Sequence, residues 1–72
     1  MKRSEAAALL KELGAEHLLQ PNWVLIEQRK LDRYQLCVKG DYDRNGIEFI
    51  LQKYALEIEE DITRGYMCIF KP

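Results

Sequence analysis

The chain contains one stretch twice: residues 14–20 are GAEHLLQ, and residues 46–52 are GIEFILQ. Sliding the sequence against itself by 32 positions extends this match over residues 14–39 and 46–71, with eight identities in 26 pairs. Average composition predicts only about two identities over that length. We therefore expect two copies of one structural unit, at about residues 1–40 and 41–72.

Each unit is predicted to begin with a helix. Apolar residues recur every three or four positions over about residues 4–13, which indicates a first helix with a helical continuation over 15–20. A second helix is predicted to start at an Asn45 N-cap, because Glu48 follows three residues later in a capping-box pattern. It is expected to end near Ala55, where the apolar spacing changes to alternation.

Each helix is followed by two predicted strands. The first hairpin is expected from strands at 23–28 and 34–39, joined by a polar turn. Residues 56–59 (LEIE) alternate with period two, and the repeat matches them to the first strand of that hairpin. We therefore predict strands at 56–60 and 66–71, for an α-β-β-α-β-β chain.

Charge predicts the order of the four strands in the sheet. The first strand of each hairpin carries glutamates and the second has no charge over five positions, and charged strands are favoured at sheet edges. This gives the order 3-4-2-1 in an antiparallel-type sheet. The connection from the second strand through the helix to the third is then a split β-α-β crossover, which should be right-handed, and both helices are expected on one face. The expected α+β layout is ferredoxin-like in topology only, circularly permuted so that its first strand comes last.

Strand alternation then divides the side chains between two faces. The helix-covered face is predicted to contain the core, from Val24, Ile26, Tyr34, Leu36, Val38, Leu56, Ile58, Tyr66, Cys68 and Phe70. The open face would have an apolar centre with charges around it, which is typical of a contact surface. We expect a second copy of the chain to bind there, at Leu25, Cys37, Lys39, Met67, Ile69 and Lys71. A solvated sheet face with scattered apolar residues is the alternative.

A second hypothesis is nucleic-acid binding through the basic turn of the first hairpin. That turn contains Arg29, Lys30 and Arg33, and Lys39 and Lys71 on the open face could add phosphate contacts. The net charge of −1 argues against it, as does the predicted burial of the aromatic side chains.

Motifs for chemistry are incomplete. Asp41, Asp43, Asn45 and Gly46 match the first half of a calcium loop, but Gln52 stands where the bidentate glutamate belongs, so a structural turn is favoured. Cys37 and Cys68 are predicted on opposite faces, without a disulfide and without the ligand spacing of a zinc site. An enzyme or metal-dependent protein is therefore the third hypothesis, and no catalytic residue, metal ligand or cofactor is assigned.

Length and composition indicate a single small globular domain over residues 1–72. Hydrophobic residues make up 47% of the chain and charged residues 32%, which are globular values. No stretch has the length of a membrane span or the form of a secretory signal, and two cysteines without such a signal favour a cytoplasmic protein. The leading functional prediction is thus a small cytoplasmic interaction module that forms a homodimer.

Overall fold

The computed structural model describes all residues from 1 to 72, and its elements follow the predicted α-β-β-α-β-β order. In chain order they are α1 (Arg3–Ala15), a short 3-10 helix (Pro21–Trp23), β1 (Val24–Lys30), β2 (Arg33–Val38), α2 (Arg44–Tyr54), β3 (Glu57–Asp61) and β4 (Tyr66–Phe70).

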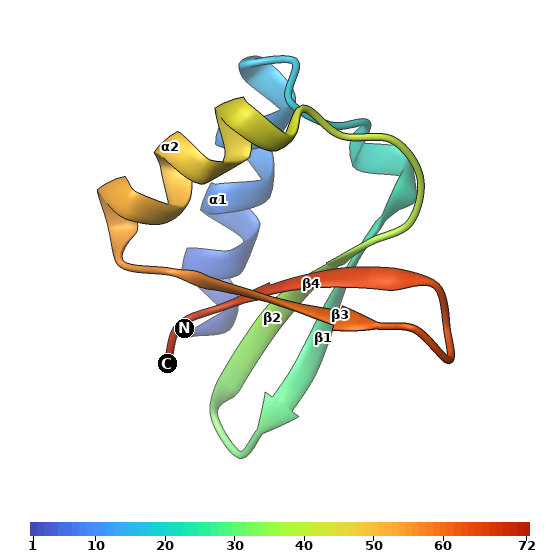
Figure 1. Ribbon diagram of the computed structural model, residues 1–72. Helices are drawn as coiled ribbons and strands as arrows, with labels where there is room; N and C mark the ends of the chain where they lie inside the picture. Colours follow the sequence, from blue (N-terminus) through green and yellow to red (C-terminus); the bar gives the residue numbers. More distant parts are fainter.

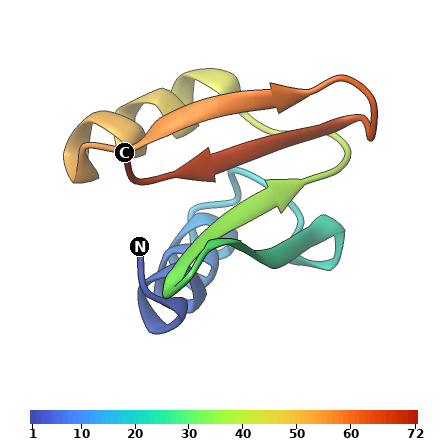
Figure 2. The ribbon, with the colours of Figure 1, turned by 90° about the horizontal axis from the view of Figure 1, so that it is seen from below.

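The four strands form one sheet in the order β1-β2-β4-β3, and every neighbouring pair is antiparallel. This is the predicted order, with the two charged strands at the edges. Both helices lie on one side of the sheet (Figure 1), and the view from below shows no helix on its other side (Figure 2). The predicted α+β class and strand order are confirmed.

The helix ends differ from the prediction at two places. α1 is continuous through Gly14 and ends at Ala15, and His17 adopts a left-handed backbone (φ 57°), so the predicted helical continuation is absent. α2 is capped by Asp43, whose carboxylate accepts the Gly46 N–H at 3.0 Å, so the predicted Asn45 cap is wrong. At its other end α2 stops before a left-handed Ala55, as expected, and the chain continues into β3.

The core lies between the helices and the two central strands. Its buried apolar side chains come from α1, α2, β2 and β4 and from two residues outside these elements, Met1 and Leu19: Met1, Ala6, Leu9, Leu13, Leu19, Leu36, Val38, Ile47, Ile50, Met67 and Ile69. Each edge strand contributes as well, because Ile26 pairs with Leu36 and Ile58 pairs with Ile69. A row of branched apolar residues therefore crosses the whole sheet beneath the helices.

The side chains of β4 point to the opposite faces of the sheet from those predicted. Met67 and Ile69, expected on the open face, belong to the core, with 4% and 1% of their surfaces exposed. Cys68, expected in the core, lies on the open face opposite Cys37. Tyr66 and Phe70 share the face of Cys68 by strand alternation.

A β-bulge in β1 explains the error. Gln28 pairs with Tyr34 and Lys30 with Arg33, which leaves Arg29 as an extra residue. The second hairpin has no bulge, because Glu57–Asp61 pairs residue for residue with β4. Relative to the 32-residue offset, the two hairpins therefore differ in register by one position, and one position exchanges the faces of β4.

Candidate functional site

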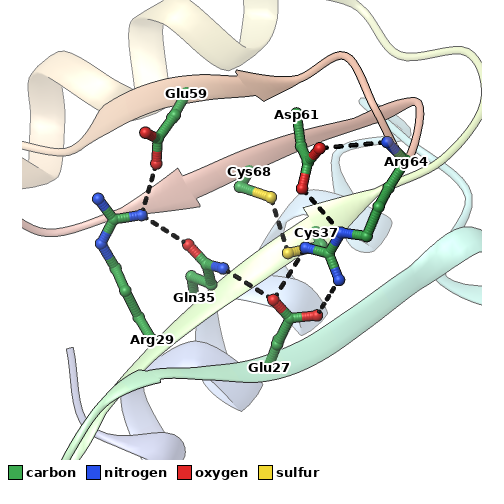
Figure 3. A network of polar contacts seen from close by, with 8 residues as sticks. All are labelled: Glu27, Arg29, Gln35, Cys37, Glu59, Asp61, Arg64 and Cys68. Atoms are coloured by element: carbon green, nitrogen blue, oxygen red, sulfur yellow. Dashed lines mark hydrogen bonds and ion pairs between the residues drawn. The ribbon is translucent and has the colours of Figure 1, made fainter.

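The open face of the sheet is crossed by Arg29, the bulged residue of β1 (Figure 3). Its guanidinium reaches Glu59 on the opposite edge strand, with an N–O distance of 2.7 Å, and donates to the Gln35 side chain at 3.0 Å. The same guanidinium stacks on the Phe70 ring, 3.8 Å from the centroid. Arg29 thus covers one half of this face.

Arg64 crosses the other half in the opposite direction (Figure 3). It comes from the turn between β3 and β4 and donates two hydrogen bonds to the Glu27 carboxylate on β1, at 2.7 and 2.9 Å. A further pair at 2.7 Å holds it to Asp61. These hydrogen bonds from Arg64 lower the pKa of both Glu27 and Asp61. We call Arg29 and Arg64 with their partners Glu27, Gln35, Glu59 and Asp61 the arginine layer.

Side chains beneath the arginine layer are buried although no helix covers them. Cys37 is 0% exposed, and Cys68 is also buried. No buried side-chain nitrogen or oxygen lacks a hydrogen-bond partner, so the layer leaves no buried polar atom of its side chains unpaired. The open face therefore has a polar cover of long side chains. From the sequence, its centre was expected to be apolar.

The predicted partner surface is accordingly divided. Leu25 and Lys39 are exposed, with Leu25 at 53%, while Cys37 lies beneath the arginine layer. Met67 and Ile69 are in the core, and Lys71 lies beside Met1 and Glu5 at the start of α1. The six predicted residues do not form one surface.

The two cysteines are neighbours, contrary to the prediction that they face opposite sides. Cys37 and Cys68 are partners across β2 and β4, and their Sγ atoms are 2.8 Å apart (Figure 3). Burial, followed by the contact with Cys68, raises the pKa of the Cys37 thiol to about 12. A raised pKa is the reverse of what an activated nucleophile requires.

The acidic loop before α2 has a structural role at Asp43, which caps the helix. This agrees with the structural turn favoured from the sequence. Nowhere in the chain do three or more His, Cys, Asp or Glu side chains come together in a group that could hold a metal ion.

The predicted basic turn is only partly available for binding. Arg29 is engaged in the arginine layer, but Lys30 and Arg33 form no ion pair. Arg33 lines a cleft that also includes Lys2, Arg3 and Lys71, none of which is ion-paired. We call this the basic cleft; its other lining residues are Met1, Glu5, Asp32 and Tyr34.

The basic cleft has a net positive charge, since four cations face two carboxylates. It lies at the N-terminal end of α1, where the helix dipole adds positive potential. Glu5 accepts the Lys2 backbone N–H at 3.1 Å, which is the main cause of its lowered pKa, and Lys71 lowers that pKa further. Lys2 and Arg3 were not among the predicted binding residues. They reach the first hairpin because the Tyr34 N–H donates to the Met1 carbonyl at 2.7 Å.

An apolar hollow of about 250 Å³ adjoins the basic cleft and shares Met1, Glu5 and Lys71 with it. It lies between α1 and the junction of α2 with β3. Its other lining residues are Ala8, Leu9, Glu12, Tyr54 and Leu56. The Tyr54 hydroxyl donates to Glu12 at 2.6 Å, which fixes the ring at the side of the hollow.

Comparison of the chain with protein-family models, curated proteins and solved structures found no match. None of its helices combines the length and the apolar character needed to cross a membrane.

Proposed function

We propose that this protein binds single-stranded nucleic acid at the basic cleft. One observation supports the proposal: three separate parts of the chain bring together Lys2, Arg3, Arg33 and Lys71. None of these four side chains forms an ion pair with a carboxylate. The arginines and lysines that are ion-paired, in contrast, all lie outside this cleft: Arg29, Arg44, Lys53 and Arg64. The chain has a net charge of −1, so four unpaired cations gathered at one place on its surface favour a local contact with phosphates.

The adjoining hollow favours a single strand over a duplex. A phosphate in the basic cleft places the next base near the apolar walls at Leu9, Tyr54 and Leu56. A base enters such a hollow only when it is unpaired, and contact with an aromatic ring contributes about 1–3 kcal/mol per base. Recognition of this kind has little sequence preference, since every base offers the same flat faces.

Fluorescence anisotropy with a labelled 12-nucleotide single strand tests the proposal. We expect binding to weaken with salt, with a slope of log K against log salt concentration near −2 if about three phosphates are contacted. Arg33→Glu is expected to weaken binding at least tenfold at low salt. Lys11→Glu makes the same charge change on an exposed, unpaired residue outside the cleft, and should change the affinity less than twofold. Equal losses in both variants, or no binding by the wild type, would contradict the proposal.

A second function, self-association, is favoured by a separate observation. Trp23 and Leu25 are 55% and 53% exposed beside the free edge of the sheet at β1. The other edge, β3, carries Glu57, Glu59, Glu60 and Asp61, and this charge would repel a second copy. We propose that two copies of the chain pair through their β1 edges and bury Trp23 and Leu25, in place of the surface predicted from the sequence.

Sedimentation equilibrium tests this second function. We expect a concentration-dependent dimer for the wild type and a monomer for Leu25→Lys. Phe49→Lys places the same charge at an exposed apolar residue on α2 and should leave the dimer unchanged. A wild type that remains monomeric up to millimolar concentration removes the homodimer from consideration.

We further propose that the two halves are duplicated αββ units in a permuted ferredoxin-like layout. The eight identities support this, as does the agreement of both hairpins with the 32-residue offset. The helices argue against a simple copy, because the offset places α2 on residues 12–22, which overlap only the last turn of α1. A chain opened in the turn after β3, with residue 72 linked to residue 1, has the ferredoxin-like order. It should fold with an unchanged circular dichroism spectrum; failure to fold counts against the layout.

A further inference from the structure

Cys37 and Cys68 are directly opposite one another on the two central strands. Their neighbours pair in the same register, Leu36 with Ile69 and Val38 with Met67, so the ladder fixes the position of both cysteines. Their side chains share the open face, with the Sγ atoms 2.8 Å apart, and both are free thiols. Each is buried beneath the arginine layer.

We propose that Cys37 and Cys68 form a redox-modification site, at which a small disulfide oxidant such as glutathione disulfide converts the pair into a reversible cross-strand disulfide. Directly opposite residues of an antiparallel pair have Cα atoms about 4.5–5.5 Å apart. Disulfides span Cα distances of about 4.4–6.8 Å. The bond therefore requires rotation of the two side chains and no movement of the strands.

The reaction proceeds by two thiol–disulfide exchanges. The thiolate of one cysteine attacks a sulfur of glutathione disulfide, which forms a mixed disulfide and releases one glutathione. The thiolate of the second cysteine attacks the protein sulfur of that mixed disulfide, which forms the Cys37–Cys68 bond and releases a second glutathione. The two protein thiols lose two electrons and two protons, and one glutathione disulfide becomes two glutathione thiols.

The arginine layer controls access to the pair. Arg64 lies over Cys37 and is held there by Glu27 and Asp61 (Figure 3). It belongs to the turn after β3 and is itself partly exposed, so it can move away without opening the sheet. Burial also keeps the pKa of the Cys37 thiol high, which makes the reactive thiolate rare while the layer is closed. Oxidation of the folded protein should therefore be slow, at a rate set by movement of Arg64.

The test is incubation of the folded, reduced chain with glutathione disulfide, followed by alkylation of free thiols and intact mass spectrometry. We expect a monomer that has lost two hydrogens, binds no glutathione and returns to the dithiol with dithiothreitol. Its Tm should rise by several degrees, because the bond closes the chain between β2 and β4. A wild type that retains both thiols, stops at the glutathione adduct or forms the bond only in denaturant overturns the proposal.

Two variants test the role of the arginine layer. Arg64→Gln should increase the rate of disulfide formation at least tenfold, whereas Arg44→Gln, which breaks an exposed ion pair with Glu48 on α2, should leave it unchanged. Glu27→Gln loosens the same guanidinium from its partner and should also increase the rate, which provides a second measurement if Arg64→Gln does not fold. Equal rates in all variants would show that Arg64 does not control access.

Discussion

Ile69 and Phe70 are neighbours on β4 whose side chains lie on opposite faces of the sheet. Ile69 is 1% exposed and packs in the core, while Phe70 is half-buried on the open face under Arg29. Substituting a fully buried isoleucine by alanine typically costs about 2–5 kcal/mol. A domain of this size has a net stability of only about 3–5 kcal/mol.

We therefore expect Ile69→Ala to be close to unfolding and Phe70→Ala to retain a clear folding transition. Urea denaturation followed by circular dichroism measures both. The opposite ranking would restore the face assignment made from the sequence, in which Phe70 was in the core.

The hydrogen bonds of Arg64 to Glu27 and Asp61 should make the stability of the fold depend on pH. The pKa values of Glu27 and Asp61 are lower in the folded protein than in the unfolded chain, mainly because both accept hydrogen bonds from Arg64. The folded state thus favours the ionised carboxylates. Their stabilising effect is complete above their unfolded pKa values of about 4. It is lost as the pH falls through the lower pKa values of the folded state.

The variant Arg64→Gln should consequently have a lower Tm than the wild type at pH 7 and a smaller loss of Tm between pH 6 and pH 2. The difference should be modest and should shrink in high salt, because these groups are partly exposed. Parallel melting curves at all pH values would contradict the assigned role of Arg64.

Among the secondary structure elements, the hairpins show what the sequence could predict and what it could not. Alternation located β1 and β3, and the absence of charge placed β2 and β4 at the centre of the sheet. The bulge at Arg29 has no signal in composition or periodicity, because an arginine suits an edge strand with or without one. That single residue reversed the assignment of β4, and with it the predicted interface at Met67 and Ile69.

Two deletions test the bulge. Removing Arg29 should leave Gln28 paired with Tyr34 and keep Val24 and Ile26 toward the helices, since only the extra residue is lost. Removing Glu59 breaks the same ion pair with Arg29, but it shifts Ile58 to the open face and turns Glu57 toward the core.

We expect the Arg29 deletion to melt close to Arg29→Ala, because both lose the same contacts. The Glu59 deletion should be much less stable, since it removes the partly buried Ile58 from the core face and puts the charged Glu57 in its place. Differential scanning calorimetry compares the three chains. Similar melting of the two deletion variants would mean that β1 has no bulge in solution.

The same limits apply to the basic cleft. Arg33 and Lys71 were identified from local sequence, but the contribution of Lys2 and Arg3 depends on a hydrogen bond between Met1 and Tyr34, which are far apart in the chain. Contacts of this kind follow from the packing of α1 on the sheet. A single sequence contains no local pattern that indicates them.

In the whole molecule, the arginine layer takes the place of a third structural layer. A sheet with helices on one side exposes its other side to water, and a chain of 72 residues has no element left to cover it. Arg29 and Arg64 cross that side in opposite directions and bury Cys37, Cys68 and part of Phe70 beneath aliphatic stems and paired guanidinium groups. Together with the burial of Met67 and Ile69 in the core, this explains why the exposed apolar patch expected from the sequence is absent.

The double variant Arg29→Ala/Arg64→Ala should therefore uncover an apolar surface at Cys37, Cys68 and Phe70. We expect it to remain folded, because the core of the helical side is untouched, but to bind the dye ANS and to self-associate in sedimentation velocity experiments. Removing Arg44 and Lys53 together, Arg44→Ala/Lys53→Ala, eliminates two exposed ion pairs at α2 and provides the matched control, in which neither property should change. If the double variant of the layer behaves like this control, the two arginines do not cover the face in solution, and the burial of Cys37 and Cys68 must have another cause.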